Sequence, residues 1–305
     1  MSSMPLEVVL FGHIVMDTVV RGRRRWQSVG GTVVYGAFAA LRHGAKPIVV
    51  SKVGEDFLDE YLIFLARNDV DISYVRVVPR GKTTRFKLVY RDTERELTLL
   101  SRAESIGRLD AELIDLSGRV AIVGPVAGEV ELEALESVYS RARLTGLDLQ
   151  GYLRTGRIRE PIRLERSERA LEALRYADVV HADENEARVL TGQGPPESAR
   201  WMASVGPRIA LVTLGDEGAY VAWEDRLIFV PPARPSQVVD VTGAGDVYLT
   251  VFSIEYARLG SVEEAAAMAA AAVSYLVEKP GVEGLRDRWQ LRGRAQDVLK
   301  RIEEK

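Results

Sequence analysis

The sequence predicts an α/β fold in which a mostly parallel sheet is covered by helices. Two observations support this prediction. Short apolar runs such as residues 6–10 alternate with longer segments of helical spacing, as in repeated βαβ units. Residues 73–78 and 83–100 interrupt this rhythm. Residues 83–100 have alternating apolar and polar positions, which is typical of strands with one solvated face. The second pattern predicts a small, separate antiparallel sheet.

Each element of the main fold has a local reason. Buried strands are expected at short apolar runs, and helices where apolar residues recur every three or four positions. Gly44 follows one helix as a C-cap. In chain order, we expect strands at 6–10, 47–53, 119–124, 145–149, 178–181, 208–213, 218–223 and 226–230. We expect helices at 32–43, 55–68, 129–143, 166–175, 184–191, 196–204, 243–259, 262–278 and 286–303.

Two segments are expected to form a lid on a single domain that spans residues 1–305. Residues 14–29 contain two extended pieces around an arginine-rich turn. Residues 83–100 contain a hairpin that turns at Asp92 and Thr93. A small sheet above an α/β core is suited to closing over a ligand and excluding water. Exposed edges of such a sheet often pair across a dimer, so a homodimer through the lid is also expected.

Composition excludes several classes of protein. The 305 residues include no Cys and three His, so we expect no disulfide framework, no cysteine nucleophile and no His-rich zinc centre. A net charge of -3 does not indicate nucleic-acid binding. No apolar run approaches the ~20 residues of a membrane span, and no secretory signal precedes the first strand. We therefore expect a cytoplasmic protein that binds neither nucleic acid nor membrane.

The most informative segment is 238–252, VVDVTGAGDVYLTVF, where a glycine-rich turn leads directly into a helix. Backbone N–H groups of Gly243, Ala244 and Gly245 at a helix N-terminus would form a site for a phosphate or an oxyanion. Asp246 lies in the first turn, where its carboxylate could take a proton from a hydroxyl. A simple helix cap is the alternative, because Asp is common at helix starts and Gly at tight turns.

Residues 240–246, DVTGAGD, closely resemble the signature near the C-terminus of the ribokinase-like (PfkB) carbohydrate kinases. An upstream segment resembles a second signature of the family: Gly30 and Gly31 open a helix, Gly44 ends it and residues 53–56 follow. The resemblance implies a three-layer α/β/α ribokinase-like fold. It also implies transfer of the γ-phosphoryl group of Mg-ATP to an alcohol hydroxyl. No GxxxxGK[ST] or GxGxxG motif is present, which excludes a P-loop mechanism and argues against a dinucleotide dehydrogenase.

The resemblance implies roles on the acceptor side of the site. Asp246 matches the base that deprotonates the acceptor hydroxyl, and residues 243–245 match the anion hole for the transferring group. Asp17 matches an acidic residue that binds substrate hydroxyls, with a strand-end turn cap as the alternative. Gly30 and Gly31 match the double glycine, where the backbone approaches the sugar closely.

The resemblance also implies a nucleotide side. Residues 182–186 are similar to the family's Asn-x-x-Glu element, with Glu186 acting through water on Mg²⁺. Asp183 stands where Asn is usual, and a solvated helix start is the alternative for this acidic cluster. Residues 213–218, TLGDEG, resemble the nucleotide-phosphate loop, although a plain glycine turn also explains its last residue. The nucleotide-binding residues implied by this loop are Thr213, Gly215 and Gly218.

Two features bear on the acceptor. Tyr35 stands where many sugar kinases of the family have Asn, and it is equally interpreted as a core residue. Segment 148–154, DLQGYLR, places Gln150 and Arg154 over the carboxyl edge of the sheet, where α/β proteins bind ligands. This segment resembles the archaeal myo-inositol kinase branch, so myo-inositol is the favoured acceptor. A nucleoside kinase of adenosine or cytidine type, or a non-catalytic sugar-binding regulator, remains the alternative.

Two histidines near these segments are assigned structural roles. His13 follows a strand and is expected to pack at its end, with a substrate contact as the less favoured interpretation. His181 is expected to end a strand beside the nucleotide segment.

Overall fold

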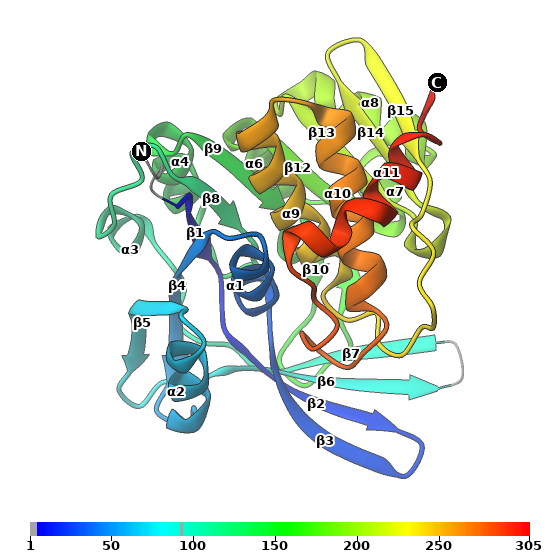
Figure 1. Cartoon of the computed structure of the whole chain (residues 1–305). Helices are drawn as coiled ribbons and strands as arrows, with labels where there is room; N and C mark the ends of the chain where they lie inside the picture. The colour runs from blue at the N-terminus through cyan, green and yellow to red at the C-terminus, as the bar shows by residue number, and fades with distance from the viewer. Residues whose placement is uncertain (1–4, 92–93) are drawn as a thin grey trace.

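The computed structural model describes residues 5–91 and 94–305. These residues form a ten-stranded main sheet, a two-stranded pair, a small four-stranded sheet and the helices that pack on the main sheet (Figure 1). The turn predicted at Asp92 and Thr93 lies outside the described residues. Within the described ranges, no helix has the length and apolar character needed to cross a membrane.

The main sheet has a parallel centre, as the βαβ pattern predicts. In spatial order its strands are β16 (Glu303–Glu304), β15 (Arg226–Val230), β14 (Ala219–Trp223), β13 (Ile209–Thr213), β12 (Val179–Asp183), β9 (Leu144–Asp148), β8 (Val120–Val123), β1 (Glu7–Phe11), β4 (Lys46–Gly54) and β5 (Asp71–Val78). Neighbouring strands from β13 to β5 pair in parallel, and the strands from β13 to β16 pair antiparallel. The carboxyl ends of the central strands therefore meet at one edge of the sheet.

Helices cover both faces of this sheet, so the fold has three layers. One face carries α1 (Thr32–Arg42), α2 (Asp59–Arg67), α9 (Ala244–Leu259), α10 (Val262–Leu276) and α11 (Arg292–Leu299). The other carries α3 (Arg108–Glu112), α4 (Leu132–Arg141), α5 (Gln150–Leu153), α6 (Glu168–Ala173), α7 (Glu184–Thr191) and α8 (Pro195–Val205). Alternation along the strands feeds both cores, since Val8 faces one and Val9 the other.

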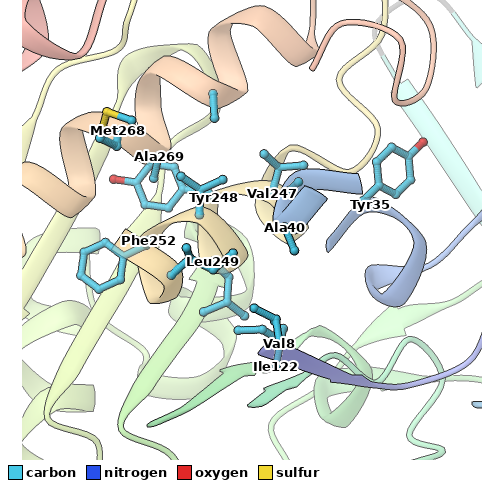
Figure 2. Close-up of a cluster of buried hydrophobic side chains, with 14 of the residues drawn as sticks. Val8, Tyr35, Ala40, Ile122, Val247, Tyr248, Leu249, Phe252, Met268 and Ala269 are labelled. Atoms are coloured by element: carbon cyan, nitrogen blue, oxygen red, sulfur yellow. The ribbon is translucent and has the colours of Figure 1, made fainter. Parts of the chain in front are cut away.

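The first core fixes the position of α9, the helix that follows the glycine-rich turn. Val247, Leu249 and Phe252 of α9 pack among strand residues such as Val8, as Figure 2 shows. The alanines of α10 allow that helix to lie close against α9. Because the core holds the start of α9 rigidly, the residues just before it have a defined position above the sheet.

The small sheet joins two hairpins in the order β3 (Arg24–Gly30), β2 (Val15–Arg21), β6 (Thr84–Arg91) and β7 (Glu94–Ser101). This confirms that residues 14–29 and 83–100 form a separate small sheet. Each hairpin is antiparallel, and β2 pairs with β6 in parallel. The parallel pairing follows from the topology, because β1 and β5 are parallel strands of one sheet and lead into β2 and β6.

His13 lies where the two sheets join. Its ring is fully buried, with Nδ1 2.7 Å from Oγ1 of Thr84 and Nε2 2.9 Å from the carbonyl oxygen of Glu104. Burial lowers the pKa of His13, so the neutral ring accepts from the Thr84 hydroxyl and donates to the carbonyl. His13 is therefore a strand-end packing residue, as the sequence favours, and it ties both hairpins to the main sheet.

Several segments differ from the expected elements, among them the short helices α3 and α5, where no helix is expected. Residues 73–78 were expected to lie outside the βα alternation, but they belong to β5, a parallel edge strand of the main sheet with mixed apolar and polar residues. The expected helix over 286–303 is shorter, since the chain turns after α11 and pairs as β16 with the sheet edge. Between α5 and α6, where no strand is expected, the chain forms a short hairpin of β10 (Arg154–Thr155) and β11 (Arg163–Leu164).

Candidate active site

A cavity of about 510 Å³ lies between the carboxyl ends of the central strands and the small sheet. Asp148, Asp183 and Thr213 line it from the ends of β9, β12 and β13. The small sheet contributes Asp17 and a set of apolar residues. Because both sheets supply walls, a ligand in this cavity would contact the predicted lid and the core together.

The cavity brings together most of the residues singled out in the sequence. The predicted site residues that line it are Asp17, Gly31, Tyr35, Gln150, Arg154, Asp183, Glu186, Thr213, Gly215, Gly243, Ala244, Gly245 and Asp246. Gly30 and Gly218 are not among the lining residues. A Cβ on Gly30 would lie 3.0 Å from Oδ2 of Asp17, so this glycine makes room for that carboxylate. Gly218 has φ +121° and packs closely against Val230, so the shape of its turn accounts for a glycine at this position.

The glycine-rich turn forms one wall at the head of α9. Gly243 adopts φ +78°, and a Cβ there would lie 2.2 Å from the Tyr35 ring. A Cβ on Gly245 would lie 2.7 Å from Cε1 of His181. Only glycine fits at either position. Tyr35 is 6 % exposed and belongs to the core, which is one of its two sequence interpretations, and it also lines the cavity.

Asp246 lies in the first turn of α9 and faces the cavity. Its Oδ1 accepts a hydrogen bond of 3.3 Å from Nε2 of Gln150. Burial, together with the nearby Asp148 carboxylate, raises the pKa of Asp246 to about 6, although Thr32 and Arg154 oppose this shift. A carboxylate with such a pKa can accept a proton near neutral pH more readily than an ordinary aspartate.

A hydrogen-bonded chain connects Asp246 with the far end of the cavity. The backbone N–H of Gln150 donates to Oδ1 of Asp148 at 2.9 Å. Oδ2 of Asp148 lies 2.8 Å from Nδ1 of His181, and Nε2 of His181 lies 3.0 Å from Oγ1 of Thr213. The chain therefore runs across three adjacent strand ends.

Asp183 and Glu186 form a capping box at the start of α7. The backbone N–H of Glu186 donates to Oδ1 of Asp183 at 2.8 Å, and that of Asp183 donates to Oε2 of Glu186 at 2.9 Å. Asp183 therefore caps a helix, which is the alternative that the sequence left open for this cluster. Burial and the carboxylates of Asp183 and Asp148 raise the pKa of Glu186, which also lines the cavity.

The lining is strongly acidic. Its eight acidic side chains are Asp17, Asp148, Asp183, Glu184, Glu186, Asp216, Glu217 and Asp246. Arg154 and His181 are the basic side chains among the described lining residues. No group of three possible metal ligands occurs within residues 5–91 and 94–305. Mg²⁺ often binds through one or two carboxylates, water and substrate phosphates, so this lining fits a cation that arrives with a polyphosphate.

Sequence reasoning missed several residues that shape the cavity. The small sheet and the adjoining loop contribute an apolar wall of Val15, Phe86, Leu88, Leu97 and Val126. The alternation of apolar and polar residues predicted that the small sheet has an apolar face, but not that this face covers the cavity. Thr32 was also missed, although its Oγ1 accepts a 3.2 Å hydrogen bond from the Gln150 amide. Its partner is 118 positions away, so no local sequence signal could have found it.

Comparison with known proteins identifies the class. The model of the pfkB family of carbohydrate kinases matches residues 5–287, so the chain belongs to this family. It is a phosphotransferase with a hydroxyl acceptor, and the family implies ATP as the phosphate donor. The architecture is the ribokinase-like fold that the sequence resemblance implied.

Individual relatives differ in their acceptors. The chain is 28 % identical over 268 residues to a cytidine kinase of Thermococcus kodakarensis, covering 85 % of this chain and 91 % of that protein. A pyrophosphate-dependent kinase of the ribokinase family, solved with a pyrophosphate analogue and myo-inositol, has a TM-score of 0.80 and 26 % identity. That alignment covers 94 % of this chain and 99 % of the other. Arabidopsis thaliana ribokinase, solved with ribose and ATP, shares the fold with a TM-score of 0.78 and 21 % identity, over 96 % and 99 % of the chains.

Proposed function

We propose that this protein transfers the γ-phosphoryl group of Mg-ATP to a hydroxyl of a small polyhydroxy compound, with myo-inositol as the favoured acceptor. The observation that carries the proposal is the position of Asp246. Its carboxylate stands in the first turn of α9, beside Gly243 and Gly245, inside a cavity walled by both sheets. A base and an anion site thus lie side by side, as phosphoryl transfer to an alcohol requires.

The proposed reaction is an in-line displacement. Asp246 accepts the proton of the acceptor hydroxyl while the oxygen of that hydroxyl bonds to the γ-phosphorus. The bond between this phosphorus and the bridging oxygen breaks, and ADP leaves with that oxygen. The backbone N–H groups of Gly243, Ala244 and Gly245 stabilise the transferring group, helped by the positive end of the α9 dipole. Proton removal and charge stabilisation then come from one helix start.

The acceptor would lie between Asp17 and the α9 head. The Asp17 carboxylate can accept hydrogen bonds from two hydroxyls, and Gln150 and Arg154 can bind further oxygens of a polyol. Gly30 and Gly31 keep the chain beside this space free of side chains, and Tyr35 closes its floor. The 26 % identity to a kinase solved with myo-inositol supports a cyclitol acceptor.

The donor would occupy the opposite end. We assign Asp183, Thr213 and Gly215, which line the cavity, to the nucleotide. Gly218 would act on the nucleotide by shaping the loop that carries Gly215, and Glu186 would act on Mg²⁺ through water. Bound Mg²⁺ would neutralise phosphate charge during transfer. The acidic lining supports this requirement, because a polyphosphate alone would be repelled by its carboxylates.

We further propose that residues 1–305 act as one domain whose segments 14–29 and 83–100 close as a lid. Closure would remove water and so favour transfer to the acceptor over hydrolysis. Strand β3 ends the small sheet with exposed residues such as Trp26, which supports pairing of two lids in a homodimer.

A nucleoside acceptor is the second candidate, because the lid wall favours it. Phe86, Leu88 and Leu97 offer an apolar surface that suits the face of a base better than a ring of hydroxyls. The 28 % identity to a cytidine kinase supports the same interpretation. The two candidates share Asp246 and differ only in what packs beneath the lid.

A substrate panel tests the proposal. Product formation would be measured with Mg-ATP or magnesium pyrophosphate as donor, against myo-inositol, ribose, fructose, fructose 6-phosphate, adenosine and cytidine. We expect turnover with myo-inositol that is lost in Asp246→Asn. Higher turnover with cytidine or adenosine than with myo-inositol would show that the acceptor is a nucleoside and not a cyclitol. Acceptor binding by calorimetry without turnover for any donor would contradict catalysis and indicate a sugar-binding regulator.

A further inference from the structure

The reaction described above does not use His181, although this residue lies at the centre of the site. His181 belongs to β12, lines the cavity and is 3 % exposed. Its ring contacts Asp148 through Nδ1 and Thr213 through Nε2, at 2.8 and 3.0 Å. Because a Cβ on Gly245 would lie 2.7 Å from Cε1, the ring packs directly against the anion hole.

Hydrogen-bond chemistry restricts the protons of this ring. An ionised Asp148 carboxylate can only accept, so Nδ1 of His181 carries a hydrogen. If the ring is neutral, Nε2 accepts from the Thr213 hydroxyl and draws its hydrogen away from the cavity. If the ring is an imidazolium, Nε2 donates to Oγ1 of Thr213, and the hydroxyl hydrogen is left for a phosphate oxygen. The protonation of His181 thus decides which way the Thr213 hydroxyl points.

The surroundings of His181 favour the cation. Asp148 of β9, Asp183 and Glu186 at the start of α7, and Asp246 of α9 are the acidic groups that face it. Arg154 is the other basic side chain among the described lining residues. Burial disfavours the imidazolium, but the ion pair and hydrogen bond with Asp148, with Glu186 and Asp183 nearby, raise the pKa of His181 overall.

We propose that His181 is a positioning residue for the phosphate donor: an imidazolium that Asp148 holds in place and that turns the Thr213 hydroxyl toward the donor phosphate. Asp148 also accepts from the backbone of Gln150, whose amide donates to Asp246. One network therefore orients the donor contact and the base. This inference rests on the proposed function, because it requires a phosphate donor beside Thr213.

Two variants of His181 separate positioning from simple packing. His181→Asn keeps a donor toward Asp148 but does not reach Thr213, whereas His181→Gln reaches Thr213 and cannot titrate. For His181→Asn we expect kcat/KM for the donor to fall about 10- to 100-fold, the worth of one charge-assisted hydrogen bond, with the acceptor KM unchanged. For His181→Gln we expect most activity to remain, but without the decline at high pH that deprotonation of the ring causes in the wild type.

Thr213→Val should lose the same donor contact, and the pair His181→Asn/Thr213→Val should lose no more than either single variant. Two kinetic results would overturn the proposal. One is a His181→Asn variant with unchanged donor kinetics. The other is a His181→Gln variant that keeps the wild-type decline at high pH.

A second readout needs no turnover. The chain has three histidines, so nitrogen-15 NMR can follow each ring, with His181→Asn to assign the signal. We expect both ring nitrogens of His181 to be protonated at pH 7 and Nε2 to shift when Mg-ATP or magnesium pyrophosphate is added. A neutral ring in both states would overturn the proposal. A protonated, donor-sensitive ring in a protein that phosphorylates no acceptor would count against the proposed function and not against His181.

Discussion

At the scale of single residues, the proposed chemistry depends on how Asp246 is kept reactive. A carboxylate on the surface would be too weak a base, and a carboxylate paired with a cation would be weaker still. Asp246 instead receives a 3.3 Å hydrogen bond from a neutral amide, Gln150, and lies near a second carboxylate, Asp148. Burial and the Asp148 carboxylate therefore raise the affinity of Asp246 for a proton, while Asp246 still lines the cavity.

Replacing this base should separate fold from catalysis. We expect Asp246→Asn to lower kcat by ~10² to 10⁴-fold, the usual contribution of a general base, with an unchanged circular dichroism spectrum. Asp297→Asn makes the same chemical change on exposed α11 and should leave kcat as it is. Near wild-type turnover in Asp246→Asn would remove Asp246 from the mechanism.

The pKa of Asp246 also predicts a pH dependence. The base acts only when ionised, and burial with Asp148 nearby raises its pKa to about 6. On the acid side, turnover should therefore fall about tenfold for each pH unit below this value. Measurement of kcat with saturating donor and acceptor between pH 4.5 and 8 checks this. A profile that stays flat down to pH 4.5 would show that another group takes the proton.

Much of the candidate site could be predicted at this scale because its acidic residues and glycines lie in short, contiguous segments. The turn before α9 and the strand-end Asp183 are local signals, and the spacing of each survives folding. Thr32, Phe86 and the relation of His181 to Gly245 could not be predicted, because they depend on how distant strands and helices meet. Tyr35 shows the same limit, since only packing reveals that one ring serves core and cavity together.

At the scale of elements, the start of α9 must fit between the Tyr35 ring and His181. Gly245→Ala would place a Cβ 2.7 Å from Cε1 of His181, which forces the first turn of the helix to shift. We expect kcat to fall about 10- to 100-fold, since the anion hole moves while the acceptor contacts remain. Gly293→Ala in α11 meets open space and is the matched control. Equal kcat values for both variants would contradict this account of the helix start.

Far from the cavity, a buried ion cluster ties α9 to its neighbours. Glu255 is fully buried; its Oε1 lies 2.9 Å from Nδ1 of His43, and it accepts from both Nε and Nη2 of Arg288. Burial alone would raise the pKa of Glu255, but hydrogen bonds from His43 and Arg288 lower it to about 2. The cluster thus fixes the end of α1 and the chain before α11 against α9.

Glu255→Gln should therefore destabilise the protein by about 3 kcal/mol at pH 7, because it removes the buried carboxylate charge that Arg288 and His43 contact. The depressed pKa means that this stabilisation is present above the unfolded value of 4.5 and is lost as pH falls toward 2. Urea unfolding at pH 7 and pH 3 would show a smaller difference at the lower pH. Exposed Glu264→Gln is the control. Equal stability of the Glu255 and Glu264 variants at pH 7 would refute the role of the cluster.

Element types were easier to predict than their ends and partners. The alternation of the main sheet and the separate small sheet follow from periodicity, which survives in any environment. The parallel pairing of β2 with β6 and the edge position of β5 depend on the spatial order of the strands, which periodicity does not determine. The last helix is shorter than its amphipathic pattern, since pairing of β16 with β15 competes for the chain end.

At the scale of the whole molecule, the arrangement of two sheets explains why one cavity can hold a donor and an acceptor. The main sheet supplies the acidic strand ends and the head of α9, and the small sheet supplies Asp17 and an apolar cover. Because His13 ties both hairpins to the main sheet, the base of the small sheet is held in place against the main sheet. The resulting geometry is suited to transfer between two bound molecules instead of to water.

The central claim is coupled transfer, and phosphorus-31 NMR on one sample tests it most directly. The spectrum would follow Mg-ATP and the best acceptor of the panel with the wild type, and with Asp246→Asn as the control. We predict that each donor consumed yields one phosphorylated acceptor, with no free phosphate, and that the variant yields almost none. Donor consumed with release of free phosphate and no phosphorylated acceptor would contradict the account.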